Sequence, residues 1–358
     1  MKQYKISFLI PISFTFFLLL DVFILQKMEF QNYFENYGII LTTFSFSKVV
    51  AGGLSILTQF LIQKIFSKDD KPEIMIKGGK DSIWLELLYY SIVSFLDILN
   101  WGYYFYPIFI LNKTGNIILE IVPKGIILIS SSLFCILLLN YKLYRHHILA
   151  LVIYILGLVA VFICLTIKMI DMKELSSIFA LLVLGCICCL GTSVKEIAEK
   201  WLMYFKFKNP FIILIAEGIV GTVVFGLVFI LALKEGEEGL YYAFDFETNF
   251  GMLIVFFISS LFVNFFNIQM NNKYFPSLRA IADSMYGFQI FLLWKNNENF
   301  MYLFSGIIPM FIGSLIYNEI IVIPFCNLEI FTKAAVDERV RLEQLRLNRD
   351  SMMDLLPS

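Results

Sequence analysis

Four charged side chains fall inside stretches that are otherwise apolar, and they form two pairs with the same spacing. Glu120 and Lys124 lie in one stretch, and Arg279 and Asp283 lie in another. Residues four apart share one face of a helix, so each pair places opposite charges side by side. A charge at the centre of a bilayer is costly and normally faces a protein interior or a water-filled cavity. We therefore expect all four to point toward the axis of a helical bundle and to line a cavity. Two self-neutralising pairs that merely pack are the alternative.

The two cations of this set are suited to an anionic solute. The guanidinium of Arg279 offers a two-pronged fork for a phosphate group, whereas the ammonium of Lys124 acts as a point charge. Glu120 and Asp283 are expected to hold these cations when the site is empty.

Other polar side chains inside apolar stretches extend the candidate site. Asp97 and Glu217 are interpreted as isolated carboxylates, suited either to polar contacts or to proton coupling. Asn264 and Asn267 share a stretch with a run of Phe residues. There they either line the cavity or link helices through hydrogen bonds.

Two local arrangements are interpreted structurally. Lys195 and Glu196, deep in an apolar stretch, are expected to pair with each other. His146 and His147 are adjacent, so they are expected at the surface without facing one site together.

The cysteines give no metal site. All six fall in apolar stretches and are interpreted as packing residues. A metal shell at 186–189 is disfavoured because no His or fourth thiol lies nearby. We predict no metal and no cofactor.

The composition indicates which kind of element must position these residues. Of 358 residues, 59% are hydrophobic and only 16% are charged, and the mean hydropathy is +0.78. These values are typical of a multi-pass membrane protein rather than a soluble domain. A span needs about 20 mostly apolar residues. Ten segments meet this requirement: 6–25, 38–66, 83–111, 117–139, 148–167, 177–205, 210–233, 250–271, 276–294 and 300–323.

The basic residues of the connecting loops predict the orientation. One set of loops holds eighteen Lys and Arg residues and the opposite set holds six. The richer side is normally cytoplasmic, so both ends of the chain are expected there.

Ten spans divide into two sets of five, and an odd number per set gives the halves opposite orientations. We therefore predict an all-α integral membrane protein of about ten transmembrane helices in two inverted five-helix repeats, 1–170 and 171–331. The fourth and ninth spans then match, with Glu120 against Arg279 and Lys124 against Asp283. Residues 332–358 alternate charged and apolar side chains and are expected to form an amphipathic tail on the cytoplasmic side.

From about 97 to 317 the order of short motifs resembles the drug/metabolite transporter superfamily. Within it, the chain is most similar to the nucleotide-sugar transporter group, solute carrier family 35, in its F6-like branch. The matching residues are Asp97 with Asn100–Tyr104, Lys124-Gly125, Glu199-Lys200-Trp201, Asn209-Pro210, Glu217-Gly218 with Gly221, Arg279 with Asp283-Ser284, and Gly313 with Tyr317-Asn318.

The resemblance implies a transporter that moves an organic anion, such as a nucleotide sugar or a related metabolite, by alternating access. It also implies an intracellular organelle membrane (Golgi, endoplasmic reticulum or endolysosomal), with the mitochondrial inner membrane as the alternative. The expected partners are an anionic solute and membrane lipids, with a homodimer or a large membrane complex as further options.

Two departures from the family pattern favour a second hypothesis. The first span carries Phe8, Phe14, Phe16 and Phe17 where the family has small and polar residues, and Ala198 replaces a carboxylate. A transporter-derived structural subunit of a larger membrane complex, without transport activity, is therefore the alternative function.

Other classes of function are disfavoured. The sequence contains no Gly-rich phosphate loop, no H-E-x-x-H and no G-x-S-x-G motif, so we predict that the protein is not an enzyme. A net charge of -1 without a basic aromatic patch gives no indication of nucleic-acid binding.

Overall fold

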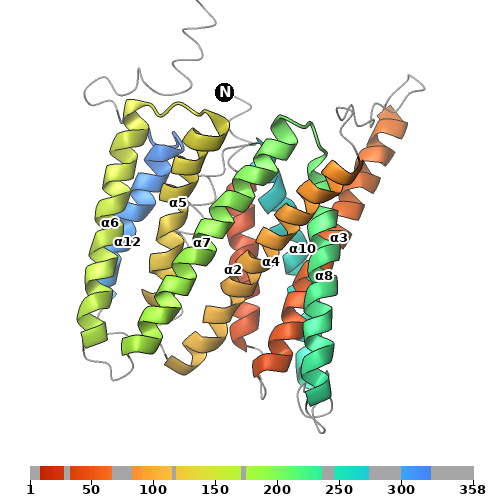
Figure 1. Ribbon diagram of the computed structural model, residues 1–358, viewed down its shortest axis with the longest axis horizontal. Coiled ribbons are helices and arrows are strands. Elements are labelled where there is room, and N and C mark those ends of the chain that lie inside the picture. Colours follow the sequence, from red (N-terminus) through yellow and green to blue (C-terminus); the bar gives the residue numbers. More distant parts are fainter. Residues whose placement is uncertain are drawn as a thin grey trace, which may run out of the picture.

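The computed structural model describes residues 9–27, 33–66, 83–114, 118–170, 175–235, 246–273 and 300–323, and its regular elements there are all α-helices (Figure 1). An all-helical chain is expected, because an apolar segment in lipid must satisfy its backbone groups internally. The helices are α2 (Leu9–Lys27), α3 (Tyr33–Phe66), α4 (Ile83–Thr114), α5 (Ile118–Leu139), α6 (Arg145–Ile170), α7 (Leu175–Tyr204), α8 (Pro210–Glu235), α10 (Phe246–Lys273) and α12 (Phe300–Tyr317).

Five of the described helices are long and apolar enough to cross a membrane, which is compatible with an integral membrane protein. Their spanning windows are Gly38–Ile62, Val122–Leu139, Arg145–Cys164, Pro210–Leu231 and Phe250–Asn272. Nine of the ten predicted segments coincide with helices, and the segment 276–294 and the tail 332–358 lie outside the described residues.

The predicted end of the last helix was too late. The apolar segment runs to residue 323, but α12 ends at Tyr317. The amide of Ile320 donates to the carbonyl of Leu315, the amide of Glu319 donates to the carbonyl of Ile316, and Glu319 has a φ of 57°. This pair of bonds is a Schellman motif, which closes a helix with one left-handed residue. Backbone geometry, not polarity, therefore ends the helix.

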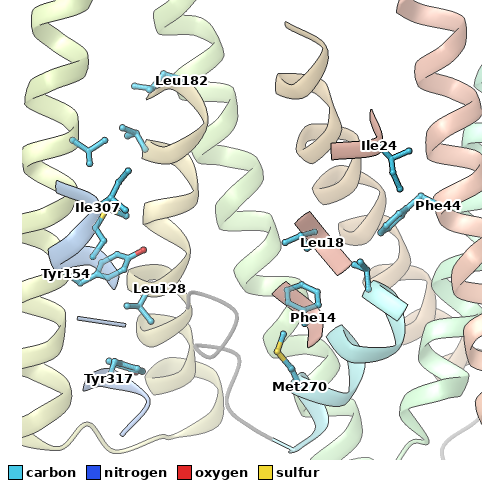
Figure 2. Close-up of a cluster of buried hydrophobic side chains, with 14 of the residues drawn as sticks. Phe14, Leu18, Ile24, Phe44, Leu128, Tyr154, Leu182, Met270, Ile307 and Tyr317 are labelled. Atoms are coloured by element: carbon cyan, nitrogen blue, oxygen red, sulfur yellow. The ribbon is translucent and has the colours of Figure 1, made fainter. Parts of the chain in front are cut away.

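The main apolar core joins helices from both halves of the chain. Figure 2 shows one group of buried side chains on α5, α6, α7 and α12, and another on α2, α3 and α10. The labelled residues are Leu128, Tyr154, Leu182, Ile307 and Tyr317 in the first group, and Phe14, Leu18, Ile24, Phe44 and Met270 in the second.

Glycines let two helix pairs approach closely. Along α3 and α8, a Cβ added to Gly52 would lie 2.9 Å from the carbonyl oxygen of Phe211. Along α6 and α12, a Cβ on Gly157 would lie 2.5 Å from the carbonyl oxygen of Gly306. Small residues that allow close backbone contact are typical of helix association in membranes.

The neighbouring glycines of α3 provide a matched test of this packing. A Cβ on Gly52 would also lie 2.6 Å from Cγ1 of Ile215, whereas a Cβ on Gly53 meets nothing within 4 Å. We expect Gly52→Ala to lower the stability by about 1–3 kcal/mol, because the added methyl group overpacks the contact. Gly53→Ala should leave stability unchanged or raise it slightly, because Ala favours the helix. Thermal unfolding of both variants in detergent tests this, and equal effects would contradict it.

Candidate functional site

Five charged side chains from four helices meet inside the bundle. Lys48 belongs to α3, Asp97 to α4, Lys195 and Glu199 to α7, and Glu217 to α8. No more than 3% of any of these side chains is exposed. We call this set the charged cluster.

The two ammonium groups bridge the three carboxyl groups. Lys48 forms an ion pair with Asp97, and its Nζ lies 3.3 Å from Oε2 of Glu217. Nζ of Lys195 lies 2.6 Å from Oδ1 of Asp97, 2.8 Å from Oε1 of Glu199 and 3.4 Å from Oε2 of Glu217. Each cation therefore connects helices that are distant in the sequence.

A fifth helix supports the cluster through an amide. Nδ2 of Asn271, on α10, donates to Oε2 of Glu199 at 2.7 Å and to the carbonyl of Glu196 at 2.8 Å. Both bonds reach α7 within one turn of Lys195. The bond to Oε2 holds the side chain of Glu199 in the orientation that pairs with the cation.

The local sequence explains how α3 and α8 come close enough to share the cluster. Asn209 caps α8, because its side-chain oxygen accepts the amide of Phe211 at 2.9 Å, and Pro210 takes the first helical position. A Cβ on Gly218 would lie 2.7 Å from the backbone nitrogen of Val49 and 2.9 Å from Cβ of Lys48. The glycine that follows Glu217 thus lets the helix of Lys48 lie directly against the carboxylate.

The structure corrects two interpretations of these charges. Asp97 and Glu217 are not isolated, because both contact Lys48 and Lys195. Lys195 pairs with Glu199, not with Glu196. Adjacent residues point in different directions on a helix, whereas residues four apart are neighbours. The Lys195-x-x-x-Glu199 spacing was the signal that sequence reasoning missed.

Of the four charged residues expected to line one cavity, the structure describes the side chain of one, Lys124. Lys124 is buried on α5, beside Gly125, which approaches Leu158 of α6 and Met310 of α12. The side chain of Glu120 lies outside what the structure describes, and so do Arg279 and Asp283. Their meeting around one cavity stays a prediction.

The polar residues of α10 differ in their roles. Asn264 is buried, and its Nδ2 donates to Oγ of Ser47 at 2.8 Å, so it links α10 to α3. Asn267 is half-buried on the same helix. Nearer α2, Ser260 donates to the buried carboxylate of Asp21 at 3.0 Å.

The two histidines are not surface residues, contrary to the sequence interpretation. Both are buried, and Nε2 of His146 lies 3.1 Å from Oε1 of Glu319. The Schellman end of α12 turns Glu319 toward the start of α6, which explains the contact. His146, His147 and Glu319 have ligand atoms within 4.8 Å of one another. However, Nδ1 of His147 accepts the amide of Tyr144, so its Nε2 carries the proton. Among the described residues, the two remaining ligands are fewer than the four that a structural zinc site needs.

Comparison of the chain with models of protein families and with curated proteins finds no match.

Removing one cation from the charged cluster should destabilise the fold. Lys195→Met leaves three carboxyl groups facing Lys48 alone, and an uncompensated buried charge costs on the order of 3 kcal/mol. We expect a clear fall in the midpoint of thermal unfolding in detergent. Adding Glu199→Gln should restore part of it.

The matched control is Lys142→Met, which removes an exposed lysine from the loop between α5 and α6. Equal midpoints for Lys195→Met and Lys142→Met would show that the cluster does not hold these helices together.

Proposed function

We propose that the protein is a multi-pass membrane transporter that moves an organic anion, of the nucleotide-sugar type or a related metabolite, by alternating access. The charged cluster is the observation that carries this proposal. Replacing a buried ion pair with well-packed apolar residues is often neutral or stabilising, so such a cluster is a poor device for stability alone. Ionisable residues inside a membrane bundle more often belong to solute or ion pathways.

The contacts between helices support ten spans in two inverted five-helix halves. In chain order, α2 to α8 are spans one to seven, α10 is span eight and α12 is span ten. Exchanging each span for the one five places away exchanges α3 with α8 and α6 with α12. The same exchange converts the contact between α2 and α10 into the contact between α7 and α4. It converts the contact between α3 and α10 into the contact between α8 and α4. All six contacts exist. A pattern that is unchanged by this exchange is expected for an internal repeat with a twofold axis.

The anion is proposed to bind at Lys124 and Arg279 rather than at the charged cluster. The two lysines of the cluster already face three carboxyl groups. Lys124 belongs to the other part of the bundle, on α5. The family resemblance and the matched spacing of Glu120, Lys124, Arg279 and Asp283 support this assignment. An organelle membrane is the proposed location.

Uptake into liposomes tests the transport proposal. We expect the purified chain to take up at least one member of a panel of nucleotides, nucleotide sugars and carboxylates. Lys124→Ala and Arg279→Ala should each abolish uptake while the protein stays folded, because each removes a cation that binds the anion. Lys142→Ala, at an exposed loop lysine, is the matched control and should transport normally.

Unchanged uptake in both cation variants would remove these residues from the mechanism. No uptake of any panel member by the unaltered chain would contradict transport itself.

A structural role in a larger membrane complex is the second candidate, favoured by the packing of the first helix. Phe14 and Leu18 of α2 are fully buried in the core. Phe17 stacks on Phe262 of α10 with ring centroids 4.5 Å apart. The first helix, α2, is expected to line the transport pathway, but its buried face carries bulky side chains.

Purification from native membranes distinguishes the two candidates. A structural subunit should co-purify in fixed stoichiometry with a large complex and bind no member of the panel. A monomer or small homo-oligomer that binds a solute would exclude this role.

A further inference from the structure

The charges of the cluster do not balance. It holds three carboxyl groups, Asp97, Glu199 and Glu217, and two ammonium groups, Lys48 and Lys195. If all five were ionised, the buried set would carry one net negative charge. Asn271 adds a neutral amide to the set through its hydrogen bond to Glu199. No third cation of those residues forms an ion pair with the three carboxyl groups.

Glu217 is the least compensated of the three carboxyl groups. Its two cation contacts, at 3.3 and 3.4 Å, are the longest in the cluster. Its Oε1 is buried and receives no hydrogen bond from the described residues. Asp97 and Glu199, in contrast, each lie within 2.8 Å of an ammonium group.

Glu217 also faces a second carboxyl group. Oε1 of Glu199 and Oε2 of Glu217 lie 2.8 and 3.4 Å from the same ammonium nitrogen, Nζ of Lys195, so the two carboxyl groups share one cation. Two ionised carboxylates have only acceptor atoms, so a hydrogen bond between them requires a proton on one of them. Carboxyl groups that share a site do not ionise together easily, because the like charges repel.

We propose that the charged cluster binds one proton, held on Glu217 and shared with Glu199, and that this proton is the coupling ion of the transport proposed above. With the proton bound, two cations face two anions and the buried set is neutral. Without it, one uncompensated charge remains inside the contact of α3, α4, α7 and α8, which is costly. The proton therefore favours the conformation in which these helices are packed together. A conformation that exposes Glu217 to water releases it.

The proton site is tested without any solute. Infrared spectroscopy of the full chain in detergent at neutral pH detects the carbonyl stretch of protonated carboxyl groups, and exchange into D2O identifies the exchangeable ones. Charge balance makes a specific prediction: Glu217→Gln, Glu199→Gln and Asp97→Asn should each remove the same signal. Each variant leaves two carboxylates facing two ammonium groups. Lys48→Met should instead enlarge the signal.

Two variants outside the cluster serve as controls for the infrared measurement. Asp21→Asn removes another buried carboxyl group outside the cluster, and Glu86→Gln removes a half-buried one that pairs with Lys208. Neither should affect the signal that the cluster variants remove. Glu217→Gln imitates the neutral carboxyl group, so it should unfold at the same temperature as the unaltered chain. A signal that survives in all three cluster variants, or that only Glu217→Gln removes, overturns the shared proton.

Coupling rests on the proposed function and has its own readout. Liposomes that contain the chain and the pH-sensitive dye pyranine receive the same panel of nucleotides, nucleotide sugars and carboxylates. We expect a luminal pH change during uptake, present in Glu86→Gln and lost in Glu217→Gln. Uptake without a pH change overturns coupling but not transport. Absence of uptake overturns transport and coupling together, while the infrared signal still decides whether the proton site exists.

Discussion

The interior of this bundle depends on one electrostatic constraint: charges buried at the contact of α3, α4, α7 and α8 must compensate one another. Lys195 satisfies most of this requirement, because it lies within 3.4 Å of a carboxyl oxygen on α4, on α8 and on its own helix. Lys48 joins two of the same carboxyl groups from α3. A shift of any one helix would separate a buried ion pair, so the four helices are fixed together.

Backbone packing makes this arrangement possible. Gly218 allows α3 to approach α8 at the level of Lys48, and Gly52 continues the same close contact one turn away. Side chains larger than hydrogen at these positions would separate the helices and lengthen the contacts of Glu217, which are already the longest of the cluster. Packing and electrostatics are therefore linked at this interface. The glycines determine the distance between α3 and α8, and the ion pairs determine which residues of the two helices lie opposite each other.

Much of the fold could be predicted from the sequence, because runs of apolar residues identify helices directly. The ends were less predictable. The closure of α12 depends on the left-handed backbone of Glu319, a residue type with no strong preference for that conformation. The site was predicted only in part. Asp97 and Glu217 were identified as charges in apolar surroundings, but Lys48 and Glu217 are 169 residues apart. No local pattern connects such partners. The contact of His146 with Glu319 likewise joins residues that are far apart in the sequence.

If the two halves are related as proposed, the two corresponding contacts are chemically unequal. The contact of α4 with α7 contains the ion pair of Asp97 and Lys195. The contact of α2 with α10 contains the stacked rings of Phe17 and Phe262 and one hydrogen bond to Asp21. Ion pairs in an apolar interior depend strongly on distance and on charge state, whereas ring stacking depends weakly on either. The ion-paired contact would therefore respond more strongly to gain or loss of a proton, although the carboxyl group of Asp21 also lies at the second contact. An inverted repeat needs such a difference, because two identical contacts give a proton no means to favour one conformation over the other.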